Sequence, residues 1–193
     1  YGNARDIAQR EGMDSLAAEL DHNVAHLHFL RGDHRRALGL YTEARRHSEA
    51  IGDAYHAALC DLDQAEVYLE LNLIAESADL ASTAASGFER LGMDYERAKA
   101  LTFLSIAEHR RRNTSRALLL LSTARRLFAK LRNPVWTALT DLHRAILLRD
   151  VGQTRPAWKI AGRAGAVFKS EGLLHRWCLA ELFLASMLLD EGH

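Results

Sequence analysis

Apolar residues recur at intervals of three and four positions along almost the whole chain. Leu59, Leu62, Ala65 and Leu69 are one example, and mostly polar or charged residues lie between such positions. This spacing places the apolar side chains on one face of an α-helix, whereas a half-buried strand would alternate at every second residue. The pattern predicts an all-α protein built from amphipathic segments of about twenty residues.

Glycines divide these segments at regular intervals. Gly12, Gly52, Gly92 and Gly172 are separated by 40 residues or a multiple of 40, and a second series with the same period contains Gly32, Asn72, Arg112, Gly152 and Gly192. Glycine or asparagine after a helix readily adopts the left-handed conformation that ends it. The chain therefore divides into helix hairpins, with full repeats at 13–52, 53–92, 93–132 and 133–172, a partial repeat at 1–12 and a half repeat at 173–193.

Aligning the repeats reveals columns of small residues that let two helices approach closely. The columns contain Ala18, Ala58, Ala98, Ala138 and Cys178; Ala25, Ala65, Ser105, Ala145 and Ala185; Ala37, Ser77, Ala117 and Ala157; and Ala44, Ala84, Ala124 and Ala164. Large apolar columns alternate with them, such as Phe88, Phe128 and Phe168. The repeats are therefore expected to share one packing scheme.

The spacing of the small columns resembles the signature of tetratricopeptide repeats. In that family a small residue of the first helix is followed by another in the second helix and by a third further along it. Ala25, Ala37 and Ala44 match this spacing, and the next three repeats match it too. The resemblance implies a right-handed superhelical solenoid of antiparallel helix hairpins that binds a protein or peptide on its concave face.

The repeat is longer than the 34 residues most common in that family. Repeats of forty residues look like the arrays of bacterial signalling proteins, most of all those joined to CHAT caspase-like peptidase domains and those of maltose-activator-type regulators. This resemblance implies a cytoplasmic scaffold or sensor segment that holds a partner or an adjoining effector domain. The alternative is a purely structural spacer or oligomerisation segment.

Neither end of the sequence carries the polar capping helix that closes natural arrays. Residues 1–12 align with the end of a second helix at 41–52, and residues 173–193 hold only a first helix. We therefore expect an interior section of a longer protein. Uncapped ends also predict self-association, with unlike ends stacking head to tail.

The concave face of such a solenoid is lined mainly by first helices, so the resemblance implies a candidate binding surface. Its residues are Glu19, His22, His26, Leu59, Leu62, Glu66, Lys99, Thr102, Ile106, Leu139, Leu142 and Ile146. The Lys and Asn constellation that grips C-terminal carboxylates in chaperone-binding members is absent from these columns. The leucines predict a groove for an amphipathic helix if they are exposed, and ordinary packing if they are buried.

Charge is distributed unevenly along the repeats. Residues 53–92 carry eight acidic and one basic side chain, whereas residues 93–132 carry three acidic and ten basic ones, among them Arg110, Arg111 and Arg112. Repeats of opposite sign would attract each other or steer a complementary partner, although solvated helix faces are the simpler interpretation. The basic run has no interleaved aromatic residues and lies near a helix end, so nucleic-acid binding is a minor hypothesis.

The composition and the short motifs restrict which other classes of protein this chain could belong to. The 193 residues include 25 basic and 25 acidic side chains, 48% are hydrophobic, and no apolar run is long enough to span a bilayer. Cys60 and Cys178 form no metal or disulfide motif, so we expect packing residues in a reduced setting. Glu19, His22 and His26 share one helix face and are the best candidates for zinc, but nothing in the sequence requires a metal. With no phosphate loop, GxSxG or HExxH motif, we predict neither an enzyme nor a cofactor.

Overall fold

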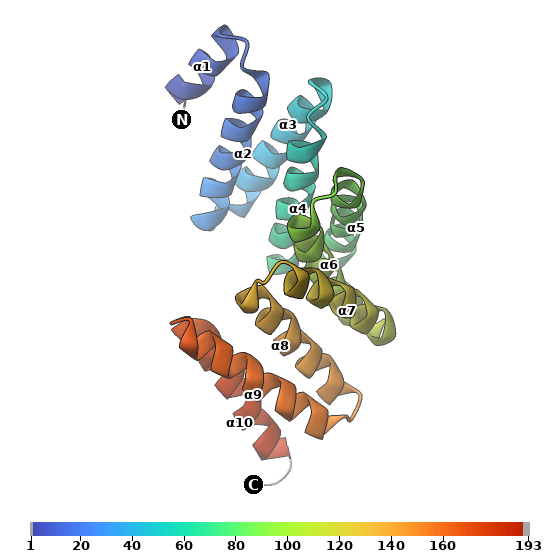
Figure 1. Ribbon diagram of the computed structural model, residues 1–193. Coiled ribbons are helices and arrows are strands. Elements are labelled where there is room, and N and C mark those ends of the chain that lie inside the picture. The colour runs from blue at the N-terminus through green and yellow to red at the C-terminus, as the bar shows by residue number, and fades with distance from the viewer. Residues whose placement is uncertain (1, 191–193) are drawn as a thin grey trace. The chain divides into compact units, whose positions relative to one another are not determined.

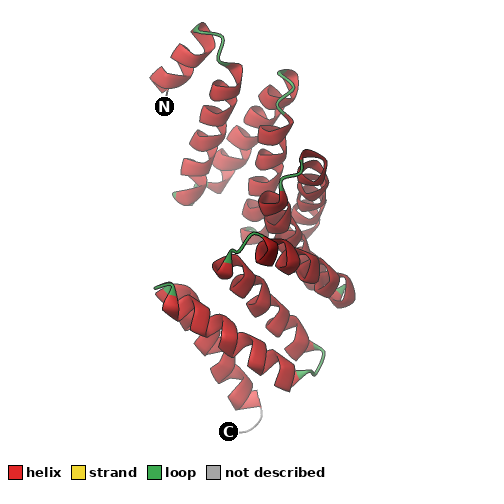
Figure 2. Ribbon diagram, viewed as in Figure 1, coloured by secondary structure: helices red, strands yellow, loops and turns green. Residues whose placement is uncertain are grey.

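The computed structural model describes residues 2–190, and this part of the chain consists of helices joined by short turns (Figures 1 and 2). The helices are α1 (Gly2–Arg10), α2 (Asp14–Leu30), α3 (His34–Ala50), α4 (Ala54–Glu70), α5 (Ile74–Leu91), α6 (Asp94–Arg110), α7 (Thr114–Lys130), α8 (Pro134–Asp150), α9 (Thr154–Ser170) and α10 (Leu174–Asp190). The even-numbered helices are the first helices of the repeats, and the odd-numbered ones are the second helices. The predicted all-α array of helix hairpins is confirmed.

The chain divides into two compact units within α6, after Ala107. Unit 1 contains α1 to α5 and most of α6, and unit 2 contains the end of α6 and α7 to α10. Within unit 1, α2 packs on α3 and α4 packs on α5, while α3 also packs on α4. Within unit 2, α8 packs on both α7 and α9, and α9 packs on α10. The helices of these pairs thus pack on their neighbours in sequence, as the repeat pattern requires.

Each turn between helices contains one residue in the left-handed conformation. Gly52 has a φ of 75° and Gly92 one of 69°, as predicted for a residue that ends a helix. Where the glycine series is interrupted, Arg112 adopts a φ of 68° and Arg132 a φ of 52°. A left-handed residue with a side chain costs about 1–2 kcal/mol. The turn geometry is therefore kept in these repeats even where the favourable residue is absent.

The small columns lie where helices cross. Ala25, Ala65, Ser105 and Ala145 are all fully buried, and so are the large side chains of the column Phe88, Phe128 and Phe168. A Cβ atom added to Gly87 of α5 would lie 3.2 Å from the Cβ of Ala58 on α4, which is tighter than ordinary packing. The small residues are therefore required by the separation of the helix backbones, since larger side chains would strain the packing.

The last first helix differs from the others. Cys60 is buried as predicted, but Cys178 of α10 is exposed, which corrects the expectation that both cysteines pack inside the protein. Ala185 is exposed too, although its counterparts are buried. The reason is that α10 packs mainly on α9, with side-chain contacts to α8, and the described part of the chain covers no more of its surface. Sequence columns predict which face a helix would bury, and burial itself needs a neighbour.

An ion pair recurs at the interfaces between repeats, where it joins a second helix to the following first helix. Arg45 of α3 donates from Nε to the Oδ1 atom of Asp61 on α4 at 2.6 Å, and Arg125 of α7 makes the equivalent 2.7 Å bond to Asp141 of α8. Arg5 contacts Asp21 in the same way. We call these pairs the Arg–Asp clasps. The arginine and the aspartate each recur at intervals of 40 or 80 residues. The sequence therefore contained this pattern, although only the small and large apolar columns were recognised in it.

Two of the junctions between repeats lack a clasp. One of them has Gly165 and Glu181 at the corresponding positions. The other has Ala85 and Leu101, and both side chains are buried. An isolated arginine or aspartate at this place would leave a charge without its partner, which costs more than removing the pair altogether. An apolar pair is therefore an alternative solution for the same interface.

The Arg45–Asp61 clasp provides a test of this interpretation. Asp61 exposes only 3% of its surface. This burial raises the pKa of its carboxyl group, and the charge of Arg45 opposes the rise. We expect Arg45→Ala to lower the free energy of unfolding by about 1–3 kcal/mol, because the carboxylate loses its charged partner. The double variant Arg45→Ala, Asp61→Leu should recover most of this loss, because it reproduces the Ala85 and Leu101 pair. Urea denaturation measures both, with Arg46→Ala at the adjacent exposed position as the control. A double variant no more stable than the single one would contradict the interpretation.

Candidate protein-binding surface

The residues predicted to line a concave surface all lie on first helices. Glu19, His22 and His26 are on α2; Leu59, Leu62 and Glu66 are on α4; Lys99, Thr102 and Ile106 are on α6; and Leu139, Leu142 and Ile146 are on α8. The first nine belong to unit 1 and the last three to unit 2. The candidate surface therefore consists of two first-helix faces, one in each unit.

One column of this set is buried rather than exposed. His22, Leu62, Thr102 and Leu142 expose between 0% and 7% of their surface. With 3.6 residues per turn, they lie about 60° around the helix from the column that begins with Glu19. That rotation turns them toward the packed interior, so Leu62 and Leu142 offer a partner almost no surface. Leu59 and Leu139 are half-buried, so the leucine strip is neither fully exposed nor fully buried.

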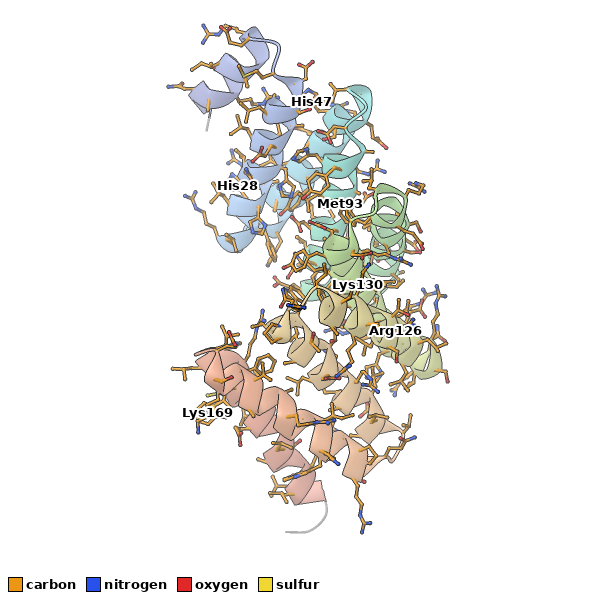
Figure 3. All side chains as sticks on the ribbon, in the orientation of Figure 1. His28, His47, Met93, Arg126, Lys130 and Lys169 are labelled. Carbon is orange, nitrogen blue, oxygen red and sulfur yellow. The ribbon has the colours of Figure 1, made fainter. Side chains whose placement is uncertain are left out.

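The remaining columns reach the surface. Glu19 is exposed, and the other side chains are partly exposed: His26, Leu59, Glu66, Lys99, Ile106, Leu139 and Ile146. These positions include both apolar and charged side chains, and side chains project along the length of the described helices (Figure 3). A surface of this kind presents side chains from rigid elements at fixed spacings, as recognition of an extended or helical segment requires.

A polar network lies beneath the face of unit 1. His22 Nε2 lies 2.8 Å from Asp63 Oδ2, the Tyr41 hydroxyl donates to the same oxygen at 3.5 Å, and His26 Nδ1 lies 3.1 Å from the Tyr41 hydroxyl. Burial raises the pKa of Tyr41 above its usual range, and the charge of Asp63 adds to this. The network joins α2, α3 and α4 and holds the imidazole of His26 in place. Asp63 was not singled out from the sequence, since its role depends on contacts between residues about 40 positions apart.

These contacts also bear on the zinc hypothesis. His22 and His26 use a ring nitrogen on Asp63 and on Tyr41, and their rings are parallel with centroids 6.4 Å apart rather than converging on one point. Within residues 2–190, no three His, Cys, Asp or Glu side chains are grouped so that they could hold a metal ion. Burial raises the pKa of Cys60 to about 12, so its thiol is not an activated nucleophile at neutral pH.

The two first-helix faces differ in charge. In unit 1, burial raises the pKa of Glu66 and the nearby Lys99 partly offsets it, while Glu96 accepts a 3.5 Å hydrogen bond from the Tyr55 hydroxyl. In unit 2, Arg176 of α10 lies over the Trp136 ring of α8 at 5.9 Å. The face of unit 1 therefore combines the carboxylates of Glu19 and Glu66 with Lys99, and the face of unit 2 presents a guanidinium group and aromatic rings.

Part of the predicted charge asymmetry is neutralised within the fold. In the acidic repeat, Asp61 and Asp63 are buried and paired with Arg45 and His22. The arginine run ends α6, as predicted, and the carboxylate of the buried Glu108 lies 3.6 Å from Arg111 and 3.5 Å from Arg116. Simple charge counts over a repeat thus exaggerate the field that a partner would meet.

Three hollows lie between successive second helices. Their volumes are about 790 Å³ beside Arg5 and Asp21, 330 Å³ beside Arg45 and Asp61, and 510 Å³ beside Arg125 and Asp141. Each therefore borders one Arg–Asp clasp at the same repeat position. Recurrence at equivalent positions indicates that they arise from the packing of the repeat rather than from one dedicated ligand site.

None of the helices within residues 2–190 combines the length and the apolar character needed to cross a membrane.

Comparisons with known proteins support the fold and not a specific family. No family model matches the sequence, and no curated protein matches it either. A Rap protein complexed with competence and sporulation factor is similar, with a TM-score of 0.81 and 18% identity over 93% of this chain and 50% of that chain. A signal-transduction ATPase with a tetratricopeptide repeat sensor from Pyrococcus horikoshii gives 0.76 and 16% over 91% of this chain and 27% of that one. A putative kinesin light chain with TPR-like repeats from Podosopora anserina gives 0.69 and 14% over 90% and 86%.

The chain therefore has the fold of a tetratricopeptide-like helix array. It spans half of the Rap chain and about a quarter of the ATPase chain, so it corresponds to only part of those proteins.

His143 of unit 2 yields a prediction about acid stability. Burial lowers its pKa from 6.5 to about 4, and the positive charges of Arg176 and His109 contribute. Because the neutral imidazole is favoured in the folded state, its contribution is complete above pH 6.5 and is lost as the pH falls toward 4. We expect this loss to be on the order of 2 kcal/mol, since one pKa unit corresponds to about 1.4 kcal/mol and partial exposure reduces the effect.

Urea denaturation of the parent and of His143→Gln between pH 7.5 and 4 measures this contribution. The variant should lose less stability than the parent over that range, whereas His175→Gln, at an exposed position on α10, should follow the parent. Equal slopes for the parent and His143→Gln would show that His143 is not held neutral by the fold.

Proposed function

We propose that this chain is a non-catalytic protein-interaction module whose first-helix faces bind a peptide or helix from a partner protein or an adjoining domain. The observation that carries the proposal is the partly exposed set of first-helix side chains, which mixes apolar and charged groups on helices packed at fixed spacings. Surfaces that combine apolar and charged side chains on rigid helices recognise protein segments.

A role as a scaffold or sensor segment of a bacterial signalling protein is the more specific form of the proposal. It is supported by the forty-residue repeat length and by two of the similar structures, a Rap protein with its bound factor and an ATPase whose repeats are described as a sensor. An effector such as a CHAT-type peptidase domain would then be carried by another part of the parent protein.

The proposal can be tested by selecting binding peptides from a random displayed library and measuring their affinities by fluorescence anisotropy. Selected peptides should lose at least tenfold in affinity with Glu66→Lys or Leu139→Glu, because both substitutions change a first-helix face. The same substitutions on second helices, Glu43→Lys and Leu119→Glu, should change affinity less than twofold, since both positions are exposed elsewhere. Failure to select any peptide, or equal losses with both sets of variants, would refute the proposal.

A second candidate function is self-association through α10, which one observation favours. Leu182 is 66% exposed and Leu189 is 74% exposed, whereas Leu62 and Leu142, the counterparts of Leu182 in α4 and α8, are buried. Sedimentation velocity over a hundredfold range of concentration should show the parent associating. Leu182→Glu should remain monomeric, and Leu119→Glu, at an exposed leucine of α7, should behave like the parent. A parent that stays monomeric at the highest concentration would exclude this candidate.

A further inference from the structure

We propose that the first-helix face of unit 2 binds an acidic amphipathic segment, through a carboxylate on Arg176 and apolar side chains on the surrounding rings and leucines. This step rests on the proposed protein-binding function and specifies its partner. The face is formed by α8 and α10, and its residues are Trp136, Leu139, His143, Ile146, Arg149, Arg176, Leu179 and Phe183.

Arg176 is the group that would contact the acidic side chain. Its guanidinium carbon lies 5.9 Å from the centroid of the Trp136 ring, and no carboxylate pairs with it among the described residues. Stacking on an aromatic ring restricts the motion of the side chain and leaves the edges of the guanidinium free to donate two parallel hydrogen bonds. An arginine held in this way binds a carboxylate with little further loss of conformational freedom.

The apolar part of the face lies on the same two helices as this cation. Leu179 is 47% exposed, and Leu139, Ile146 and Phe183 are half-buried. Aromatic residues and arginine on such a face are the side chains that most often dominate binding energy. The mixture therefore fits a segment that places apolar residues on one side and carboxylates beside them.

The remaining charges of the face favour an acidic rather than a basic partner. Arg149 lies 5.0 Å above the Phe183 ring and donates to the Ser186 hydroxyl at 3.2 Å. The nearby carboxylate, Asp150, is already shared between Arg149 at 3.5 Å and His109 at 3.1 Å. The face of unit 1 is more acidic, since it carries Glu19 and Glu66 beside Lys99, so it serves as an internal comparison.

A protein segment is also favoured over a nucleic acid. Binding to a phosphate backbone needs several cations without protein partners, and stacked bases need a series of accessible rings. Here Arg144 is 3.2 Å from Asp141, and Arg149 contacts Asp150, so the face offers Arg176 as its one unpaired cation among the described side chains. The exposed leucine beside it suits an apolar partner instead.

The test uses two fluorescein-labelled synthetic helical peptides with the same leucine stripe, one with glutamate and one with lysine at every polar position. Anisotropy titrations with the full chain should show the glutamate peptide binding at least tenfold more tightly than the lysine peptide. Arg176→Glu and Arg176→Gln should each weaken the glutamate peptide at least tenfold, with helicity checked by circular dichroism. Arg155→Glu makes the same change of charge as Arg176→Glu, at an exposed position of α9, and should change the affinity less than twofold.

Other outcomes would overturn the inference in distinguishable ways. Equal losses with Arg176→Glu and Arg155→Glu would indicate attraction by overall charge rather than by this face. Tighter binding of a single-stranded thymidine oligonucleotide, lost with Arg176→Gln, would assign the face to a nucleic acid. If the lysine peptide binds better and Glu66→Lys abolishes its binding, the proposed protein-binding function is retained and the proposal of an acidic partner is rejected. If neither these peptides nor any selected peptide binds, the proposed function fails as well.

Discussion

The close approach of helices at the small-residue columns is the constraint from which the rest of this structure follows. Where Gly87 meets Ala58, an added carbon would lie 3.2 Å from the Ala58 Cβ, and the columns that begin with Ala25 and Ala44 hold buried alanine or serine in every full repeat. Helices this close exclude water from the apolar core of each unit and hold neighbouring first helices at a regular spacing. Because every repeat uses the same crossing, the spacing of surface side chains is regular as well.

Ionic contacts adapt this scheme from one repeat to the next. The Arg–Asp clasps join neighbouring repeats at three interfaces, and a buried Ala85 and Leu101 occupy the same positions at another. The polar network of His22, Tyr41 and Asp63 is a further adaptation that occurs in unit 1. Charges and apolar residues can thus be exchanged inside one backbone arrangement, provided that both partners change together.

Function enters through the side chains that packing leaves at the surface. Both first-helix faces are carried by helix hairpins of the same kind. The face of unit 1 presents carboxylates, whereas the face of unit 2 presents Arg176 over Trp136. A repeat array can therefore carry different binding preferences on equivalent positions without altering its core. This separation is consistent with the similarity in fold to helix arrays that share only 14–18% sequence identity with this chain.

The sequence by itself determined the helices, their turns and the crossing points, because these depend on local periodicity, on left-handed residues and on small side chains repeated every 40 positions. It did not determine which residues of a first helix are accessible. The column that begins with His22 lies only about 60° around the helix from the column that begins with Glu19. Contacts with neighbouring helices determine that Leu62 of the first column is buried while Glu19 of the second is exposed. Cys178 is exposed for the same reason, since the burial of a helix face depends on what packs against it. The clasps, the His22–Asp63 bond and the stacking of Arg176 on Trp136 also arise from tertiary structure, which brings together residues from different helices.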